Sequence, residues 1–203
     1  GATIEPIDPV RYISNHSSGK MGYAIAEALV QRGAEVTLVS GRTALDKPEG
    51  VERVDVLSAE QMYNECKARF SQCDGAVMCA AVADFTPEHT AENKIKREGD
   101  QLVIRLNPTQ DIAQAMGQMK REDQKLVGFA LETCNEAENA RKKLEKKNLD
   151  FIVLNSLNDE GAGFQHDTNK ITLIDATESQ SFPLKSKTEA AKDIINRLKQ
   201  IMA

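Results

Sequence analysis

The alternation of helical and extended patterns along the 203 residues constrains the fold of this chain more than any other feature. Between residues 20 and 155, apolar residues spaced three or four apart repeatedly give way to short apolar runs. This order is typical of βαβ units, in which parallel strands form a sheet and helices cover both of its faces. Helices are predicted over 20–32, 58–70, 108–119, 135–147 and 186–201, and strands over 34–40, 75–80, 125–131 and 150–155.

Two further extended stretches, 170–175 and 181–184, can pair as an antiparallel hairpin near the end of the chain. The predicted fold class is therefore α/β, with a Rossmann-like, doubly wound, mostly parallel sheet and a C-terminal antiparallel hairpin. In such sheets ligands bind beyond the C-terminal ends of the strands. A functional site is expected in the loops that follow Ser40, Ala80, Leu131 and Asn155.

Composition and charge narrow the class of protein. With 40% apolar residues, the chain is expected to form one domain over 1–203. A formal net charge of −5 with scattered basic residues argues against nucleic-acid binding, and no apolar run reaches the roughly 18 residues of a membrane span. No signal peptide is visible and the four cysteines form no C-x-x-C pair, so a cytoplasmic location with reduced thiols is expected.

Two segments depart from a regular alternation. The first predicted helix has no strand before it, and residues 1–9 look like the turn after an absent strand, so the first strand of the domain is expected to be missing. The stretch 84–100 is polar, has no periodicity, and is longer than a compact connection needs. A loop of that length is expected to be mobile or functional.

Ser17, Ser18 and Gly19 stand immediately before the first predicted helix, where backbone N–H groups and the helix dipole favour an anion such as a phosphate. A plain helix cap explains the two serines almost equally well. The spacing of a P-loop is absent, because no Gly precedes at the right place and Met21 replaces Ser or Thr.

Other candidate residues follow the predicted strands, and each also has a structural explanation. Asp84 follows small residues at a strand end, where it can accept from a nucleoside, hold a cation or cap a loop. Three cations over 94–97 can close over a triphosphate or simply be solvated. Phe129 can stack on a base or pack in the core, and Lys143 and Lys147 share one face of a polar helix.

Several sequence motifs, taken in order, resemble the bacterial phosphopantothenoylcysteine synthetases. Residues 8–22 read DPVRYISNHSSGKMG, which is the most specific of these motifs. The others are AAVAD over 80–84, KIKR over 94–97, GFALET over 128–133 and KNLD over 147–150. In this family the domain is commonly the C-terminal half of a bifunctional coenzyme A biosynthesis flavoprotein whose other half is a decarboxylase.

The resemblance implies a CTP-dependent ligase that joins 4′-phosphopantothenate to L-cysteine. The carboxylate of phosphopantothenate would attack the α-phosphorus of CTP, which releases pyrophosphate and leaves an acyl cytidylate, and the cysteine amine would then displace CMP. Mg²⁺ is expected to arrive with the phosphates of CTP, and FMN only where a decarboxylase half is fused. A homodimer is also implied, for which the 170–184 hairpin is a possible interface.

The resemblance also assigns roles to individual residues. Asn15 would donate to the acyl carbonyl, Lys94 would act at the triphosphate, and Arg11 would lie near the intermediate. Two departures from the family pattern are a longer 107–111 segment and Arg97 at a position where Lys is frequent. The nucleotide would contact Ser17, Ser18, Gly19, Met78, Cys79, Ala80, Ala81, Asp84, Lys94, Gln110, Asp111, Ile112, Ala113, Phe129, Lys143 and Lys147.

Two other functions stay open from the sequence. The first is an NAD(P)-dependent oxidoreductase on the same kind of sheet, which is disfavoured because no G-x-G-x-x-G motif follows a strand. The second is a nucleotide-binding module without catalysis.

Overall fold

A five-stranded mixed sheet forms the centre of the computed structural model, which describes residues 1–97, 99, 101–132, 134–156, 158, 161, 163 and 166–202. The strand order is β12-β11-β9-β8-β5. β5 (Gly75–Met78), β8 (Lys125–Glu132) and β9 (Phe151–Ser156) run parallel, while β11 (Thr172–Ile174) and β12 (Ser179–Ser181) are antiparallel at one edge. The predicted parallel sheet with a C-terminal hairpin is confirmed, although the hairpin strands are shorter than expected.

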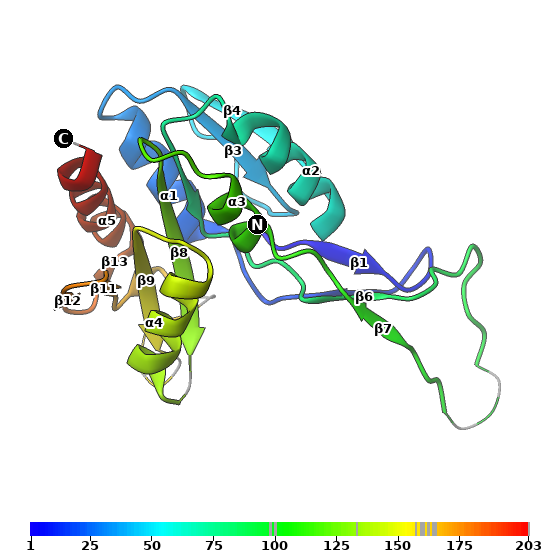
Figure 1. Cartoon of the computed structure of the whole chain (residues 1–203). Coiled ribbons are helices and arrows are strands. Elements are labelled where there is room, and N and C mark those ends of the chain that lie inside the picture. Colours follow the sequence, from blue (N-terminus) through cyan, green and yellow to red (C-terminus); the bar gives the residue numbers. More distant parts are fainter. Residues whose placement is uncertain are drawn as a thin grey trace.

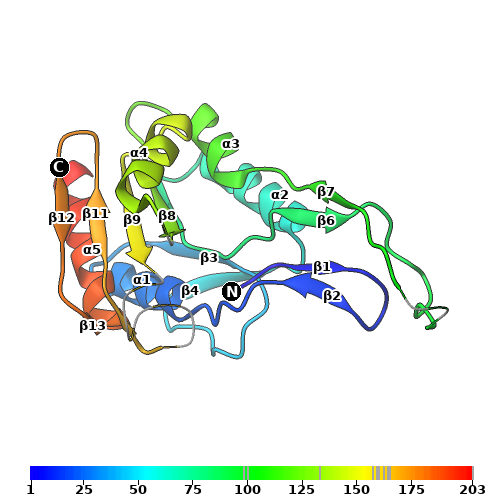
Figure 2. The same cartoon turned by 90° about the horizontal axis from the view of Figure 1, so that it is seen from below.

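Helices cover both faces of this sheet (Figures 1 and 2). α1 (Lys20–Val30) and α5 (Lys187–Met202) pack on one face against Val127 and Val153. α2 (Ala59–Phe70), α3 (Ile112–Met119) and α4 (Glu136–Lys146) form the other core with Leu126 and Ile152. Neighbouring residues of β8 and β9 thus point to opposite cores, as the pleat of a strand requires. The predicted doubly wound α/β class is confirmed.

Hydrogen-bonded side-chain caps are present at the starts of α2 and α5. The Ser58 hydroxyl accepts a hydrogen bond from the Gln61 N–H at the start of α2. Ser186 and Glu189 bond reciprocally at the start of α5, each side chain accepting from the backbone N–H of the other residue. α3 begins at Ile112 rather than near residue 108, because Leu106–Pro108 is a strand and Asp111 caps the helix.

A separate pair of parallel strands, β3 (Val36–Ser40) and β4 (Val51–Asp55), lies beside α1 and α2. β4 was not expected, because its Glu52 and Arg53 interrupt the apolar pattern. Ala2 forms isolated bridges to Arg42, which follows β3, and to Ala81, which follows β5. The missing first strand stays a prediction.

A long arm projects from the body of the molecule (Figures 1 and 2). We use "arm" for residues 4–14, 85–97, 99 and 101–108. They contain the antiparallel pairs β1 (Ile4–Pro6) with β2 (Tyr12–Ser14) and β6 (Phe85–Pro87) with β7 (Leu106–Pro108). Contrary to expectation, strands do precede α1. The 84–100 stretch begins with the strand β6, and its role as a mobile or functional loop stays a prediction. These strands have three residues each, too few to show a period in the sequence.

Two short strands, β10 (Thr168–Asn169) and β13 (Lys185–Ser186), pair antiparallel before α5. Within the described residues, no helix is both long and apolar enough to span a bilayer.

Candidate active site

The start of α1 lacks a side-chain cap among the described residues. Gly19 is the N-cap residue, and its φ of 84° places it in the left-handed region. No side chain among the described residues caps the helix, and no acidic residue lies in its first turn. The Ser17 hydroxyl instead accepts from the Gly19 N–H at 3.3 Å. The cap explanation for the two serines is therefore wrong, and the anion-binding explanation remains.

Asn15 joins this helix start to the end of β5. Its side-chain amide donates to the backbone carbonyls of Ala81 and Val82, at 3.3 and 3.2 Å. The first turn of α1 also lies against the residue that follows β5, since a Cβ added to Gly22 would be 3.9 Å from the Cys79 sulfur. Asn15, Ala81 and the uncapped helix thus form one region.

The chain after β7 returns to the same strand end. The Thr109 N–H donates to the Asp84 carbonyl at 2.9 Å, and the Thr109 hydroxyl donates to the Ala83 carbonyl at 2.7 Å. These bonds place Gln110 and Asp111 beside residues 83–84, although the two segments are more than 20 residues apart. The carboxyl group of Asp84 is exposed to solvent.

Asp111 has two structural partners. One carboxylate oxygen accepts from the Gln114 N–H at 3.0 Å and so caps α3, and the other lies 3.0 Å from the ammonium of Lys147. The predicted neighbour Ile112 is 4% exposed and belongs to the core, so its side chain does not face a ligand. Ala113 is half-buried on the same helix.

The remaining nucleotide candidates lie on β5, β8 and α4. The Lys143 ammonium is 2.6 Å from the Glu132 carboxylate at the end of β8. Phe129 and Cys79 pack against the core under α1 and α5, whereas Met78 and Ala80 pack against the opposite core. Burial raises the pKa of the Cys79 thiol to about 12, so this thiol is a packing group near neutral pH.

The Arg11 side chain forms a hydrogen bond to the basic segment 94–97 on the arm. Its guanidinium donates to the Asp8 carboxylate and, at 2.7 Å, to the Ile95 carbonyl. The Ile95 N–H donates back to Asp8 at 3.1 Å. Hydrogen bonding by Arg11 keeps the pKa of Asp8 well below its usual range. Sequence reasoning missed Asp8, although the three-residue spacing of Asp8 and Arg11 within the first motif was a usable signal.

Lys94 is exposed, and it lies on the segment between β6 and β7 at the outer part of the arm. In both views this segment is remote from α1 (Figures 1 and 2). The start of α1 and the basic segment therefore do not meet within a single chain in this conformation. Arg11 lies on the arm as well.

No cluster of three or more His, Cys, Asp or Glu side chains suited to a metal ion occurs among the described residues. The geometry leaves one region where most predicted residues meet: the start of α1, Asn15, the end of β5 and the start of α3. Backbone donors, an amide and the Lys147 ammonium beside Asp111 suit a phosphorylated ligand.

Comparison with protein families identifies the family of this chain. A family described as "DNA/pantothenate metabolism flavoprotein C-terminal domain" matches residues 1–202. The chain belongs to this family. The family resemblance drawn from residues 8–22 and the later motifs is therefore confirmed.

Curated relatives of the family include larger proteins. A protein named cysteine/cysteine sulfinic acid decarboxylase, from an unknown prokaryote, is 54% identical over 98% of this chain and 56% of its own length. The coenzyme A biosynthesis bifunctional protein CoaBC of Vibrio vulnificus is 44% identical over 100% of the chain and 51% of its own length. CoaBC of Escherichia coli is 45% identical over 92% of this chain and 47% of its own length. The chain thus spans about half the length of these relatives.

Among solved structures, the C-terminal domain of a CoaBC protein superposes with a TM-score of 0.84 at 41% identity, covering 100% of this chain and 92% of that one. A second structure, of Cab2 H337A in complex with phosphopantothenate-cysteine, has a TM-score of 0.80 at 17% identity. The match covers 98% of this chain and 84% of that one. This second likeness concerns the fold alone.

Proposed function

We propose that this domain is a phosphopantothenate–cysteine ligase that uses CTP and acts in coenzyme A biosynthesis. The observation that carries the proposal is the uncapped start of α1 beside Asn15 at the end of β5. The full-length match to the CoaBC C-terminal domain supports the same activity.

The first chemical step needs positive charge around a triphosphate. The carboxylate of 4′-phosphopantothenate attacks the α-phosphorus of CTP, the bond to the β-phosphate oxygen breaks, and pyrophosphate leaves. The N–H groups at the start of α1, together with Lys143 and Lys147, supply donors for this region. Mg²⁺ would enter with CTP and neutralise phosphate charge.

The second step needs a donor at the acyl carbonyl. The cysteine amine attacks this carbon, CMP leaves, and the amine loses a proton as the amide forms. Asn15 can polarise the carbonyl after exchanging at least one of its two bonds to the carbonyls of Ala81 and Val82. This exchange costs little, because the amide is exposed and both bonds are near the long end of the usual range.

The arm supports the proposal of a homodimer. Its side chains include six exposed large apolar groups: Val10, Tyr12, Phe85, Leu102, Val103 and Leu106. Apolar groups gathered in this way mark protein interaction surfaces. By contrast, β12 in the C-terminal hairpin exposes Ser179, Gln180 and Ser181. We therefore place the dimer interface on the arm rather than on the hairpin suggested by the sequence.

Lys94 can act on the nucleotide if the outer part of the arm moves, or if a second copy brings its own arm to the site. These routes differ in one observable quantity. Specific activity is independent of protein concentration in the first case, and in the second it falls on dilution together with the dimer fraction.

A product assay tests the proposed activity. The purified chain is supplied with CTP, Mg²⁺, 4′-phosphopantothenate and L-cysteine, and the appearance of phosphopantothenoylcysteine, CMP and pyrophosphate in equal amounts is expected. Pyrophosphate release that does not depend on phosphopantothenate would overturn the ligase proposal. Replacing CTP by ATP tests nucleotide preference, and binding of NAD(P)H would favour the oxidoreductase.

The name of one relative motivates a second assay. Carbon dioxide release from cysteine or cysteine sulfinic acid should be absent if the proposal holds, and its presence would assign the decarboxylase activity of that relative to this segment.

A further inference from the structure

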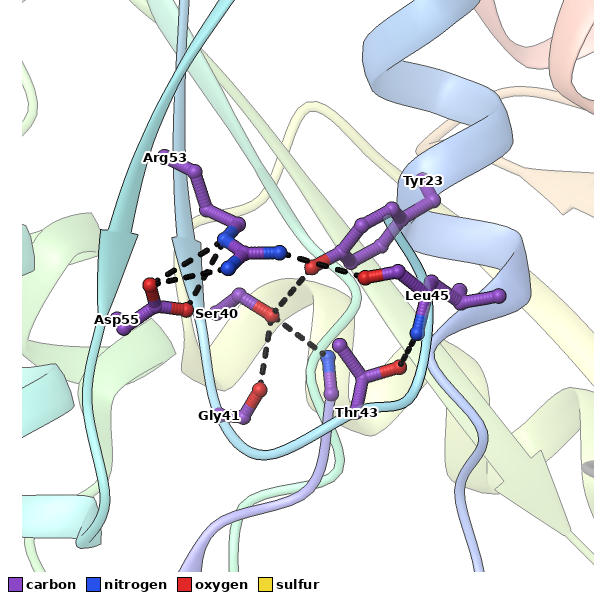
Figure 3. A network of polar contacts seen from close by, with 8 residues as sticks. Tyr23, Ser40, Gly41, Thr43, Leu45, Arg53 and Asp55 are labelled. Atoms are coloured by element: carbon purple, nitrogen blue, oxygen red, sulfur yellow. Dashed lines mark hydrogen bonds and ion pairs between the residues drawn. The ribbon is translucent and has the colours of Figure 1, made fainter. Parts of the chain in front are cut away.

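Thr43 contacts the loop that leads into α1. It lies after β3, and its hydroxyl donates to the Ser18 carbonyl at 2.8 Å while accepting from the Leu45 N–H at 3.2 Å. The hydroxyl therefore uses its one donor toward Ser18 and one of its two acceptor lone pairs toward Leu45. Figure 3 shows Thr43 with its bond to Leu45.

The bond from Thr43 sets the direction of a neighbouring backbone donor. In a planar trans peptide the C=O and the following N–H point in opposite directions. Because the Ser18 carbonyl points to Thr43, the Gly19 N–H points away from the 41–45 loop, toward Ser17. Gly19 has a positive φ and no Cβ, so nothing in its own side chain restrains this orientation.

A side chain of β4 forms a hydrogen bond to the 41–45 loop. Arg53 donates to the Leu45 carbonyl at 3.3 Å, and the Arg53 Nε lies 3.0 Å from a carboxylate oxygen of Asp55 (Figure 3). The loop that holds Ser18 is thus attached to a strand on its other side. This support lets the Thr43 hydroxyl act as a fixed point rather than as part of a free loop.

We propose that Thr43 is a positioning residue for phosphate binding, because its hydroxyl orients the Ser18–Gly19 peptide so that the Gly19 N–H faces the phosphates of the nucleotide. This inference rests on the proposed function, in which the nucleotide lies at the start of α1. On binding, a phosphate oxygen replaces the Ser17 hydroxyl as the acceptor of the Gly19 N–H. Thr43 does not touch the nucleotide in this arrangement.

The test compares Thr43→Val with Thr43→Ser. Valine has the same shape but cannot bond to Ser18 or Leu45, whereas serine keeps the hydroxyl. Thr37→Val on β3 is the matched control, since its hydroxyl contacts only the Glu52 side chain among the bonds described. We expect Thr43→Val to raise the KM for CTP and the Kd for Mg-CTP about fivefold to twentyfold, the effect of one lost hydrogen bond. The kcat and the KM for cysteine should stay within about twofold.

A spectroscopic readout separates positioning from folding. In ¹H–¹⁵N spectra the Gly19 amide signal should move when Mg-CTP is added to the wild type and to Thr43→Ser, and should move much less with Thr43→Val. Equal Kd values for the wild type and Thr43→Val would overturn the inference, and so would a loss in Thr43→Ser as large as in Thr43→Val.

Binding also distinguishes this inference from the ligase proposal. A wild type that binds Mg-CTP but makes no product overturns the ligase, while the Kd comparison still decides the role of Thr43. A wild type that binds neither Mg-CTP nor inorganic tripolyphosphate overturns the inference. Should Thr43→Val fold poorly, as melting temperature would reveal, Thr43→Ala gives the same comparison without the added methyl groups.

Discussion

Replacing Asn15 by Asp tests the proposed second step most directly. The two side chains are nearly the same size, but an ionised carboxylate has no N–H to donate. In the folded chain it would also face the carbonyls of Ala81 and Val82, which now accept from the amide at 3.3 and 3.2 Å. The substitution therefore removes a donor at the acyl carbonyl and weakens the attachment of residue 15 to the end of β5.

The expected magnitudes differ between folding and catalysis. Two exposed hydrogen bonds of this length contribute about 1 kcal/mol together, which corresponds to a change in melting temperature of about 2–4 °C for a chain of this size. Loss of a donor to a developing oxyanion typically lowers the rate by about 10²- to 10³-fold. Catalysis of amide formation should thus fall far more than stability does.

The assay separates the two half reactions. With CTP and phosphopantothenate alone, Asn15→Asp should release pyrophosphate and accumulate the acyl cytidylate, and added cysteine should consume that intermediate slowly. Asn64→Asp, an exposed change of the same kind on α2, is the matched control and should leave both steps unchanged. Equal loss of both half reactions, or a drop in melting temperature above about 10 °C, would refute the reasoning.

Three further predictions follow from other contacts. Lys94→Gln should slow pyrophosphate release and the overall reaction together, whereas Lys67→Gln on α2 should change neither; normal formation of the intermediate would remove Lys94 from the mechanism. Burial raises the pKa of Cys79 to about 12, so above the ordinary value of 9.0 the folded state keeps a proton that the unfolded state loses. The free energy of unfolding, measured by chemical denaturation, should therefore fall between pH 9 and 12, and it should fall less steeply in Cys79→Ala. A Cβ added to Gly117 would lie 1.9 Å from the Lys147 carbonyl, so Gly117→Ala should lower the free energy of unfolding by about 2–4 kcal/mol, while Gln118→Ala on the same helix should change it by less than about 0.5 kcal/mol.

The sequence predicted those helices and strands that bury one side in a hydrophobic core. α1, α5, β8 and β9 each place several residues in a core, so their apolar periods are complete enough to read. The arm gives no such signal, because β2 and β7 are largely exposed and three residues long. β4 was missed for a similar reason, since only its first residue is fully buried.

The candidate site was predicted where neighbours in sequence define it. Asn15, Ser17 and Gly19 lie together because they are close in sequence on the segment that leads into α1, and the end of β5 follows from the topology of a parallel sheet. The position of Lys94 could not be predicted, because it depends on how far two hairpins of the arm extend from the body. The contact between Thr43 and Ser18 joins residues 25 apart and has no motif of its own.

Asp111 uses one carboxylate oxygen to cap α3 and the other to pair with Lys147, so a ligand can draw the Lys147 ammonium away at a small cost in free energy. One oxygen of this carboxylate terminates α3, and the other holds the lysine, which is 24% exposed. A phosphate that draws the ammonium away breaks one surface ion pair, typically about 0–1 kcal/mol, and leaves the helix terminus intact. Recruitment of a cation is thereby uncoupled from the integrity of the fold around it.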